Sequence, residues 1–197
     1  MNGFLNQFEM INLPLENSAV FNLSWMQVRP VVTQIFGINK SIYSRFGMQG
    51  HNGIDFRAPV GTPVFSPVSG MVKIKSDKGG YGLHVSIRLP WPTPYEIKLG
   101  HLSSVDEALD GKIINTGTFI GKTGNTGIST GPHLHIGLRF LIPTEEQVIE
   151  FIKEPNNIIF DWEIKDNNNG FLGYVDIENS MIANKGSINK TTLTPSK

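Results

Sequence analysis

The chain has 197 residues, 39% hydrophobic and 17% charged, a composition typical of a globular protein and not of a disordered one. Lys+Arg and Asp+Glu both number 17, so no net field favours nucleic acid or an anionic membrane. The absence of cysteine excludes disulfides, thiolate zinc sites and a cysteine nucleophile. No apolar run approaches the roughly 20 residues that a membrane-spanning helix requires.

The first 28 residues mix polar and apolar side chains without a clean period, and we expect residues 1–28 to form an N-terminal extension. They lack the basic region and following apolar run that are typical of a signal peptide.

From Val31 to Arg139, glycine and proline separate short β-rich runs such as TPVFSPVSGMVKIKS, GLHVSIRLP and HLHIGLRFL. Several of these runs alternate apolar and polar residues, as half-buried strands do. Pro92 and Pro94 do not suit a central strand and indicate a hairpin loop. We therefore expect a mainly β domain over residues 29–142, an antiparallel β-sheet or β-sandwich whose Gly/Pro-rich loops form a groove.

The segment TEEQVIEFIKEP follows this β-rich region. An acidic first turn, apolar residues at Val148, Ile149 and Ile152, and Thr144 as a candidate N-cap predict a short helix over 145–153. We expect residues 143–178 to dock on the core and the polar residues 179–197 to form a tail.

Three of the five histidines and one aspartate occur at spacings that suit a metal site. On an extended segment His51 and Asp55 share a face, and Gly53 between them has no side chain; imidazole with carboxylate suits zinc. His133 and His135 also share a strand face, roughly 6.6 Å apart. Both could bind one metal, one could bind while the other faces the metal-bound water, or both could be ordinary strand histidines.

The two remaining histidines carry no metal signal of their own. His101, in KLGHLSS, ends a predicted strand, and alone it would be a structural hydrogen-bonding residue. His84 is expected to be structural or solvent-facing.

Taken together, H-x-x-x-D, then H-L-S, then TGNTGISTGPHLH resemble the lysostaphin-type zinc metallopeptidases, which cut peptide bonds in bacterial peptidoglycan. The resemblance covers roughly residues 31–140 and includes GHNGIDFRAPVGTPVFSPVSGMV and GTFIGKTGNTGISTGPHLH. It implies a zinc endopeptidase with one catalytic Zn²⁺, a peptidoglycan peptide as substrate, and no nucleic-acid partner.

The resemblance also implies a role for each matching residue. His51, Asp55 and His135 would bind the zinc, while His101 and His133 would be catalytic residues on its open side. A catalytic zinc keeps three protein ligands and one position for water, and the reaction then needs a base and an oxyanion donor. Two imidazoles can share those tasks, but the sequence does not say which takes the proton.

Further residues are candidates for the substrate groove, namely Tyr43, Arg57, Trp91, Thr126, Ser129 and Thr130. For the threonines and Ser129 a structural role in the loop is the stronger expectation. Where the family often carries Phe-Glu after H-x-H, this chain has Ile136 and Gly137, which predicts altered local packing.

Two other functions compete with the enzyme. A non-catalytic regulator of wall hydrolases, or a structural virion module, would retain the fold, but all five matching positions are intact. A biotinyl or lipoyl carrier would need a lysine at the hairpin tip, where Ser69 and Gly70 stand, and is rejected. We expect action at the bacterial cell wall, by way of a phage virion, a holin-released lysin or non-classical export.

Overall fold

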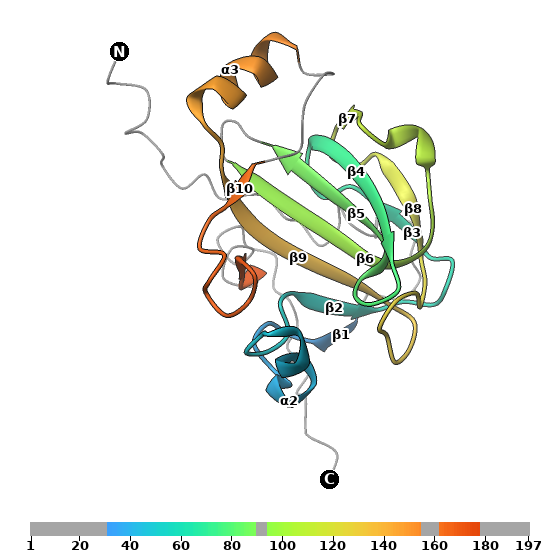
Figure 1. The fold of residues 1–197 in the computed structure, drawn as a ribbon. Coiled ribbons are helices and arrows are strands. Elements are labelled where there is room, and N and C mark those ends of the chain that lie inside the picture. The colour runs from blue at the N-terminus through green and yellow to red at the C-terminus, as the bar shows by residue number, and fades with distance from the viewer. Residues whose placement is uncertain (1–30, 90–93, 155–161, 178–197) are drawn as a thin grey trace.

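The computed structural model describes residues 31–89, 94–154 and 162–177 (Figure 1). The expectations for residues 1–28, for Trp91 and for residues 179–197 therefore lie outside the described residues.

Strands dominate the described residues and form one sheet in the order β1-β2-β9-β6-β5-β4-β7, with β3, β8, β10 and β11 joined to its members. Every pairing between named strands is antiparallel, which confirms the predicted fold class. The strands are β1 Val31–Gln34, β2 Ile54–Arg57, β3 Pro63–Phe65, β4 Gly70–Asp77, β5 Gly82–Leu89, β6 Tyr95–Val105, β7 Ile113–Ile114, β8 Phe119–Thr123, β9 His133–Ile142, β10 Glu163–Ile164 and β11 Tyr174–Val175.

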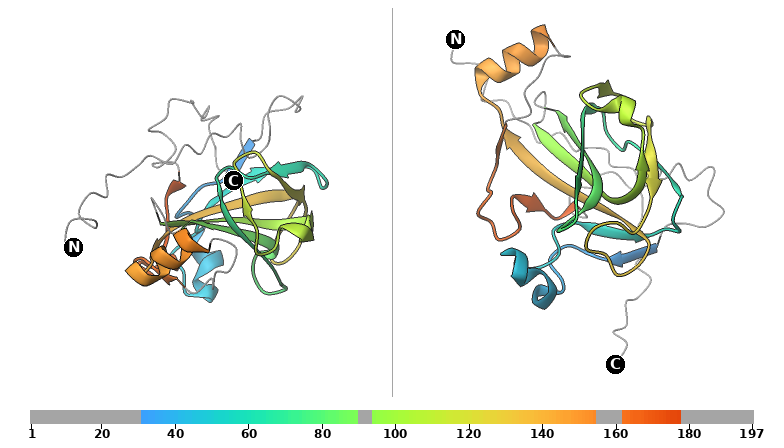
Figure 2. Two further views of the ribbon diagram at one scale, coloured as in Figure 1. Left: turned by 90° about the horizontal axis from the view of Figure 1, so that it is seen from above. Right: turned by 45° about the vertical axis from the view of Figure 1, so that its right-hand side comes forward.

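Helical structure is limited to short elements around the sheet. The α-helices are α2 Lys40–Tyr43 and α3 Glu145–Lys153, and 3₁₀ turns cover Ser44–Phe46 and Glu107–Leu109. Figures 1 and 2 place α2 and α3 at opposite ends of the sheet. Within the described residues, no helix combines the length and apolarity that a membrane crossing needs.

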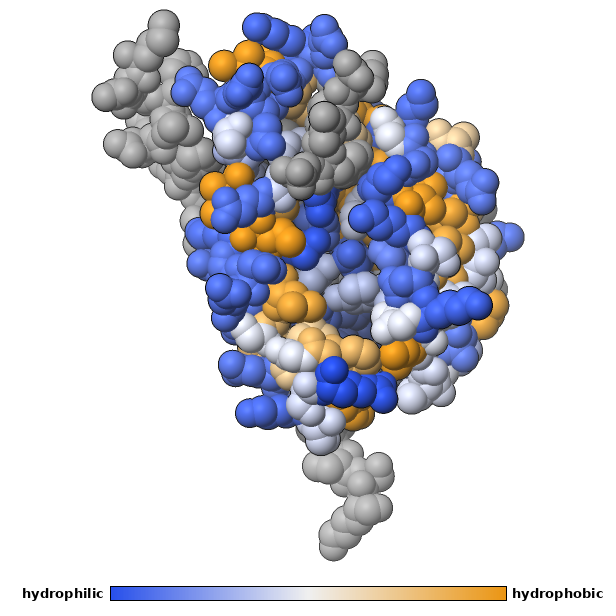
Figure 3. Space-filling model, viewed as in Figure 1, coloured by the Kyte–Doolittle hydropathy of each residue, from blue (hydrophilic) through white to orange (hydrophobic). Residues whose placement is uncertain are grey.

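The two faces of the central strands β5, β6 and β9 differ in chemistry. Opposed residues of an antiparallel pair share a face, and the pairs Leu99↔Ile136 and Ile97↔Leu138 lie in the buried apolar core. The opposite face carries the pairs Gly100↔His135, Lys98↔Gly137 and Glu96↔Arg139. Figure 3 shows the surface hollowed over the middle of the sheet, with hydrophilic residues lining the hollow.

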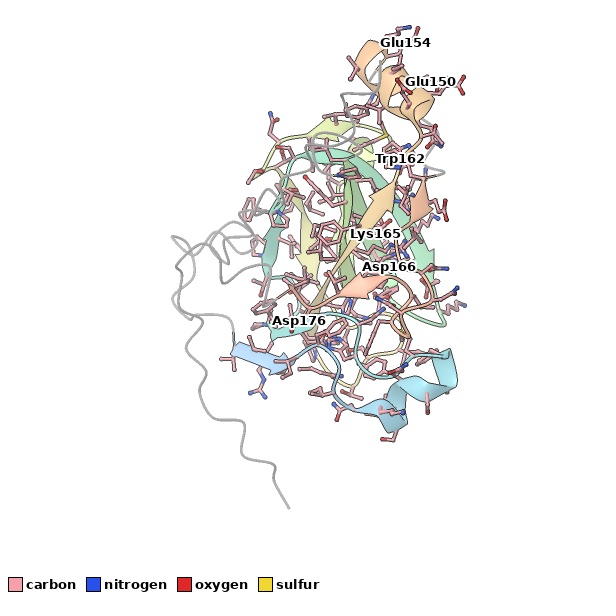
Figure 4. All side chains as sticks on the ribbon, turned by 90° about the vertical axis from the view of Figure 1, so that its left-hand side faces the viewer. Glu150, Glu154, Trp162, Lys165, Asp166 and Asp176 are labelled. Atoms are coloured by element: carbon pink, nitrogen blue, oxygen red, sulfur yellow. The ribbon has the colours of Figure 1, made fainter. Side chains whose placement is uncertain are left out.

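The segment after β9 returns along that strand. Thr144 caps α3 with a capping box, in which its hydroxyl accepts from the Gln147 N–H. β10 and β11 then pair with β9, and Trp162 and Tyr174 are buried. In Figure 4, Glu150 on α3 and Glu154 at its C-cap lie at one end of the molecule, and the segment carrying Trp162, Lys165 and Asp176 follows the sheet from there.

Gly137 shows how this chain departs from the family pattern after H-x-H. The ring of Tyr174 lies so close above it that a Cβ at position 137 would be 2.6 Å from Tyr174 Cε1. Glycine thus lets the Tyr174 ring pack against the backbone on the polar face of the sheet.

Candidate metal centre

Two neighbouring strands and the loop before one of them bring three potential metal ligands together. β2 pairs with β9 so that Asp55 is opposite His135, which places both side chains on one face. His51 precedes β2 and turns its ring to the same point. One donor atom from each of these residues lies within 4.8 Å of the other two.

The three donor atoms form a nearly equilateral triangle. Asp55 Oδ1 is 3.1 Å from His51 Nε2 and 3.0 Å from His135 Nδ1, and the two ring nitrogens are 3.0 Å apart. Ligands held about 2.1 Å from a tetrahedral zinc ion lie about 3.4 Å from one another. The triangle is therefore close to the size that a zinc ion requires.

The hydrogen bond of the His51 ring to the backbone makes a cation at this point favourable. Its Nδ1 lies 3.1 Å from the Ile35 carbonyl oxygen, which can only accept, so Nδ1 carries the hydrogen. In the neutral ring Nε2 then directs a lone pair at the Asp55 carboxylate. Two acceptors at this distance repel each other unless a cation lies between them, so the donor set fits a metal ion.

Burial keeps the other two groups in the forms that bind metals. It lowers the pKa of His135 to about 4, which leaves the ring neutral near pH 7. Burial alone would raise the pKa of Asp55, but the adjacent side chains of His135 and His51 outweigh it, and the pKa falls well below its usual range. The remaining ring nitrogen of His135, Nε2, is buried and has no hydrogen-bond partner among the described residues.

His133 and His101 lie beside this triangle. His133 Nε2 is 3.6 Å from Asp55 Oδ2, and the rings of His133 and His101 are 4.5 Å apart. His133 donates from Nδ1 to the Gly131 carbonyl at 2.8 Å, and His101 donates from Nδ1 to the Thr126 carbonyl at 2.8 Å. Each Nε2 is thus left as the nitrogen available to a reactant. Burial lowers the pKa of His101, so its ring can accept a proton near neutral pH.

The predicted groove residues lie in different settings. Tyr43 has its ring 5.3 Å from that of His51, and burial together with Asp55 raises its pKa to about 12, so the phenol stays protonated. Ser129 Oγ contacts His133 Nδ1 at 3.1 Å. Arg57 and Thr130 are exposed, and Arg57 pairs in register with His133.

The side chains of Thr126 and His84 form hydrogen bonds to the backbone and do not contribute to the triangle of donor atoms. The Thr126 hydroxyl donates to the Leu102 carbonyl at 2.8 Å and accepts from the Leu83 N–H at 3.0 Å. His84 is buried and donates from Nδ1 to the Gly82 carbonyl at 2.9 Å. His84 does not belong to the metal-ligand cluster found among the described residues.

Sequence reasoning missed Tyr81, which packs against the centre. Its ring is 5.1 Å from that of His135, and its hydroxyl accepts from Asn52 Nδ2 at 2.6 Å. The same reasoning passed over Glu96, Lys98 and Arg139. The two-residue period of β6 and β9 would have placed them on the same face as His135.

Comparison with known proteins agrees with this geometry. Residues 49–148 match the model of Peptidase family M23. The DD-carboxypeptidase/endopeptidase Mpg of Neisseria meningitidis is 45% identical over 89 residues, covering 45% of this chain and 20% of that protein. The peptidoglycan DD-endopeptidase ShyA of Vibrio cholerae is 39% identical over 88 residues, with coverages of 45% and 20%. The chain thus spans about a fifth of these relatives.

Among solved structures, the antimicrobial peptidase lysostaphin of Staphylococcus simulans aligns with a TM-score of 0.54 and 20% identity, covering 85% of this chain and 55% of that one. At this identity the likeness shows the fold alone. The family match takes in both ends of the centre, from His51 to His135, and on this ground the chain belongs to peptidase family M23.

Proposed function

We propose that this protein is a zinc-dependent endopeptidase that hydrolyses peptide bonds in the stem or crossbridge peptides of bacterial peptidoglycan. The observation that carries the proposal is the convergence of His51, Asp55 and His135 on one point, with His101 and His133 beside it. The relatives named for action on peptidoglycan supply the substrate class.

In this proposal His51 Nε2, Asp55 Oδ1 and His135 Nδ1 hold the ion. When bound, zinc supplies Lewis acidity that lowers the pKa of a coordinated water and polarises a carbonyl group. His101 and His133 divide the remaining work at their Nε2 atoms: one imidazole accepts the proton of the attacking water, and the other, carrying hydrogen on both ring nitrogens, donates a hydrogen bond to the carbonyl oxygen. Their Nδ1 hydrogen bonds to Thr126 and Gly131 hold both rings in position for this.

The test is digestion of purified peptidoglycans of several chemotypes, with and without a chelator, with the fragments identified by mass spectrometry. We expect new amino termini within the peptides, lost on chelation and restored by zinc. New reducing sugars without new amino termini would refute the proposal. Binding to the wall without any cleavage by the zinc-loaded protein would favour the non-catalytic module.

The ligand assignment has its own test, because metal content can be measured without a substrate. Asp55→Ala removes one corner of the triangle, and we expect the purified variant to lose its zinc. Equal zinc in the variant and the wild type would contradict the assignment.

A further inference from the structure

A second cluster of charged residues lies on the polar face of the sheet, along the strands from His135. Arg88, Glu96 and Lys98 are contributed by β5 and β6, and Arg139 by β9. Glu96 is 0% exposed and Lys98 8%, so the cluster is largely dry. We call these four residues the sheet cluster.

The charges of the sheet cluster do not balance. Glu96 accepts from Arg88 Nε and, at 2.8 Å, from an Arg139 terminal nitrogen, while Lys98 Nζ is 3.8 Å from it. Lys98 and Arg139 lie beside the same single carboxylate, so Glu96 cannot neutralise both of their charges. Buried charges are normally paired, because burying an unpaired one is costly.

Two donors of the sheet cluster lack a hydrogen-bond partner within the part of the chain that the structure describes. Arg139 Nε is buried without one among the described residues. Lys98 Nζ lies 3.8 Å from the nearest Glu96 oxygen, beyond hydrogen-bond distance, and 4.8 Å from the centre of the Tyr81 ring. Burial, together with Arg139 and Arg88, lowers the pKa of Lys98 to about 8. An anion placed against Lys98 would remove this imbalance.

Lys98 is well placed to meet a substrate. Tyr81 connects it to the metal centre, because the Tyr81 ring also lies 5.1 Å from the ring of His135. Along β6, Lys98 is two residues from Gly100, which pairs with His135, a separation of about 6.8 Å. An extended peptide covers that distance in about two residues. The surface over these central strands is hollowed and hydrophilic (Figure 3).

We propose that Lys98, supported by Arg139, binds a carboxylate of the peptide substrate about two residues from the bond that is cut. This inference rests on the proposed function and adds a preference for acidic peptides to it. The carboxylate could be the terminal carboxylate of the peptide or that of an acidic side chain. Both present the same two oxygens to an ammonium group, and the experiment separates them.

The experiment uses synthetic peptides built around the bond that the wild type cleaves. One pair differs only in a terminal carboxylate or carboxamide, and a second pair differs in the same way at an acidic side chain. We expect kcat/KM to favour the acid of one pair about tenfold, as loss of a charge-assisted hydrogen bond would predict. The pair that shows the preference identifies the source of the carboxylate.

The variants assign this preference to Lys98. Lys98→Met should remove the difference between acid and amide, Lys98→Arg should keep it, and Lys122→Met, on the exposed side of β8, should match the wild type. Thermal melts show which variants are folded, and the Arg variant keeps the test decisive if the Met variant is not. An acid preference that Lys98→Met leaves intact, or no preference in the folded wild type, would overturn the proposal.

A binding measurement separates this proposal from the proposed function. Titration calorimetry with the same peptides on Asp55→Ala and on Asp55→Ala with Lys98→Met needs no hydrolysis. Acid-dependent binding that disappears with Lys98 supports the carboxylate site independently of any measurement of cleavage. Cleavage without any acid preference would retain the peptidase and reject the carboxylate site.

Discussion

At the scale of single residues, the geometry of the candidate metal centre depends on the absence of a side chain at Gly53. A Cβ at this position would lie 2.6 Å from His135 Cε1 and 2.3 Å from the Ile136 carbonyl oxygen. We therefore expect Gly53→Ala to displace the His135 ring and weaken zinc binding by about 10–100-fold. Competition with a chromogenic chelator measures this. Gly79→Ala is the matched control, because a Cβ there meets nothing within 4 Å, and equal losses in both variants would contradict the argument.

For the two histidines beside the triangle we expect substitution to reduce catalysis and not zinc binding. If His101 and His133 act on the reactants and not on the ion, His101→Ala and His133→Ala should keep about one zinc per chain. Their kcat should fall by about 10²–10⁴, the contribution of general acid–base groups. Elemental analysis and peptide hydrolysis on the same samples test this. Loss of zinc from His133→Ala would move that residue into the ligand set.

The position and role of some site residues could be predicted from the sequence, whereas those of others could not. Spacing predicts that His133 and His135 share a face, but their division of roles came from the family resemblance and stays a prediction. The structure adds orientation: His135 Nδ1 faces Asp55 Oδ1 at 3.0 Å, whereas His133 Nε2 is 3.6 Å from the other oxygen. Tyr81 could not be found, because its contact with His135 depends on how a loop folds over the sheet.

At the scale of elements, the loop between β8 and β9 fixes the position of His101. The backbone of His101 is in the left-handed region, with φ of 61°. This conformation is unfavourable for residues other than glycine. Its backbone N–H donates to the Tyr81 carbonyl at 2.7 Å, and its ring donates to the Thr126 carbonyl. The loop, together with the turn between β4 and β5 that carries Tyr81, thus holds His101 in a conformation that β6 alone would not adopt.

Thr126→Val tests this support, since it keeps the side-chain shape and removes the hydroxyl. The Leu83 N–H and the Leu102 carbonyl would each lose a partner. We expect the free energy of unfolding to fall by about 1–3 kcal/mol, measured by urea titration. Thr130→Val, in the same loop and without a hydrogen bond among the described residues, should change it little. A similar loss in both variants would show that the hydroxyl bonds of Thr126 are unimportant.

Elements with a strong local signal were predictable. The α3 helix follows from its capping residues and apolar spacing, and the main strands follow from alternation between Gly and Pro punctuation. Short strands such as Glu163–Ile164 and Tyr174–Val175 were not predicted. They exist because β9 offers an edge to pair with, and a two-residue strand leaves no period in the sequence.

At the scale of the whole molecule, a net charge of zero conceals a separation of charge. The balance of 17 basic and 17 acidic residues excludes a general field, yet three cations and one carboxylate meet on the polar face of the sheet. Composition cannot reveal this, because β5, β6 and β9 become neighbours only through the register of the sheet. The positive excess arises because the fold brings residues of three strands together, and no single segment of the sequence contains it.

That excess should appear in the pH dependence of stability. The pKa of Lys98 is about 8 in the folded protein and 10.5 in its ordinary state, so between these values the unfolded chain binds more protons. Stability therefore rises with pH across this window, by at most about 1.4 kcal/mol per pH unit. Lys98→Met should show a flatter profile from pH 8 to 10 and greater stability at pH 7. Urea titrations at each pH measure both effects. Parallel profiles for the two proteins would mean that Lys98 keeps its ordinary pKa and that the positive excess of the sheet cluster is already compensated.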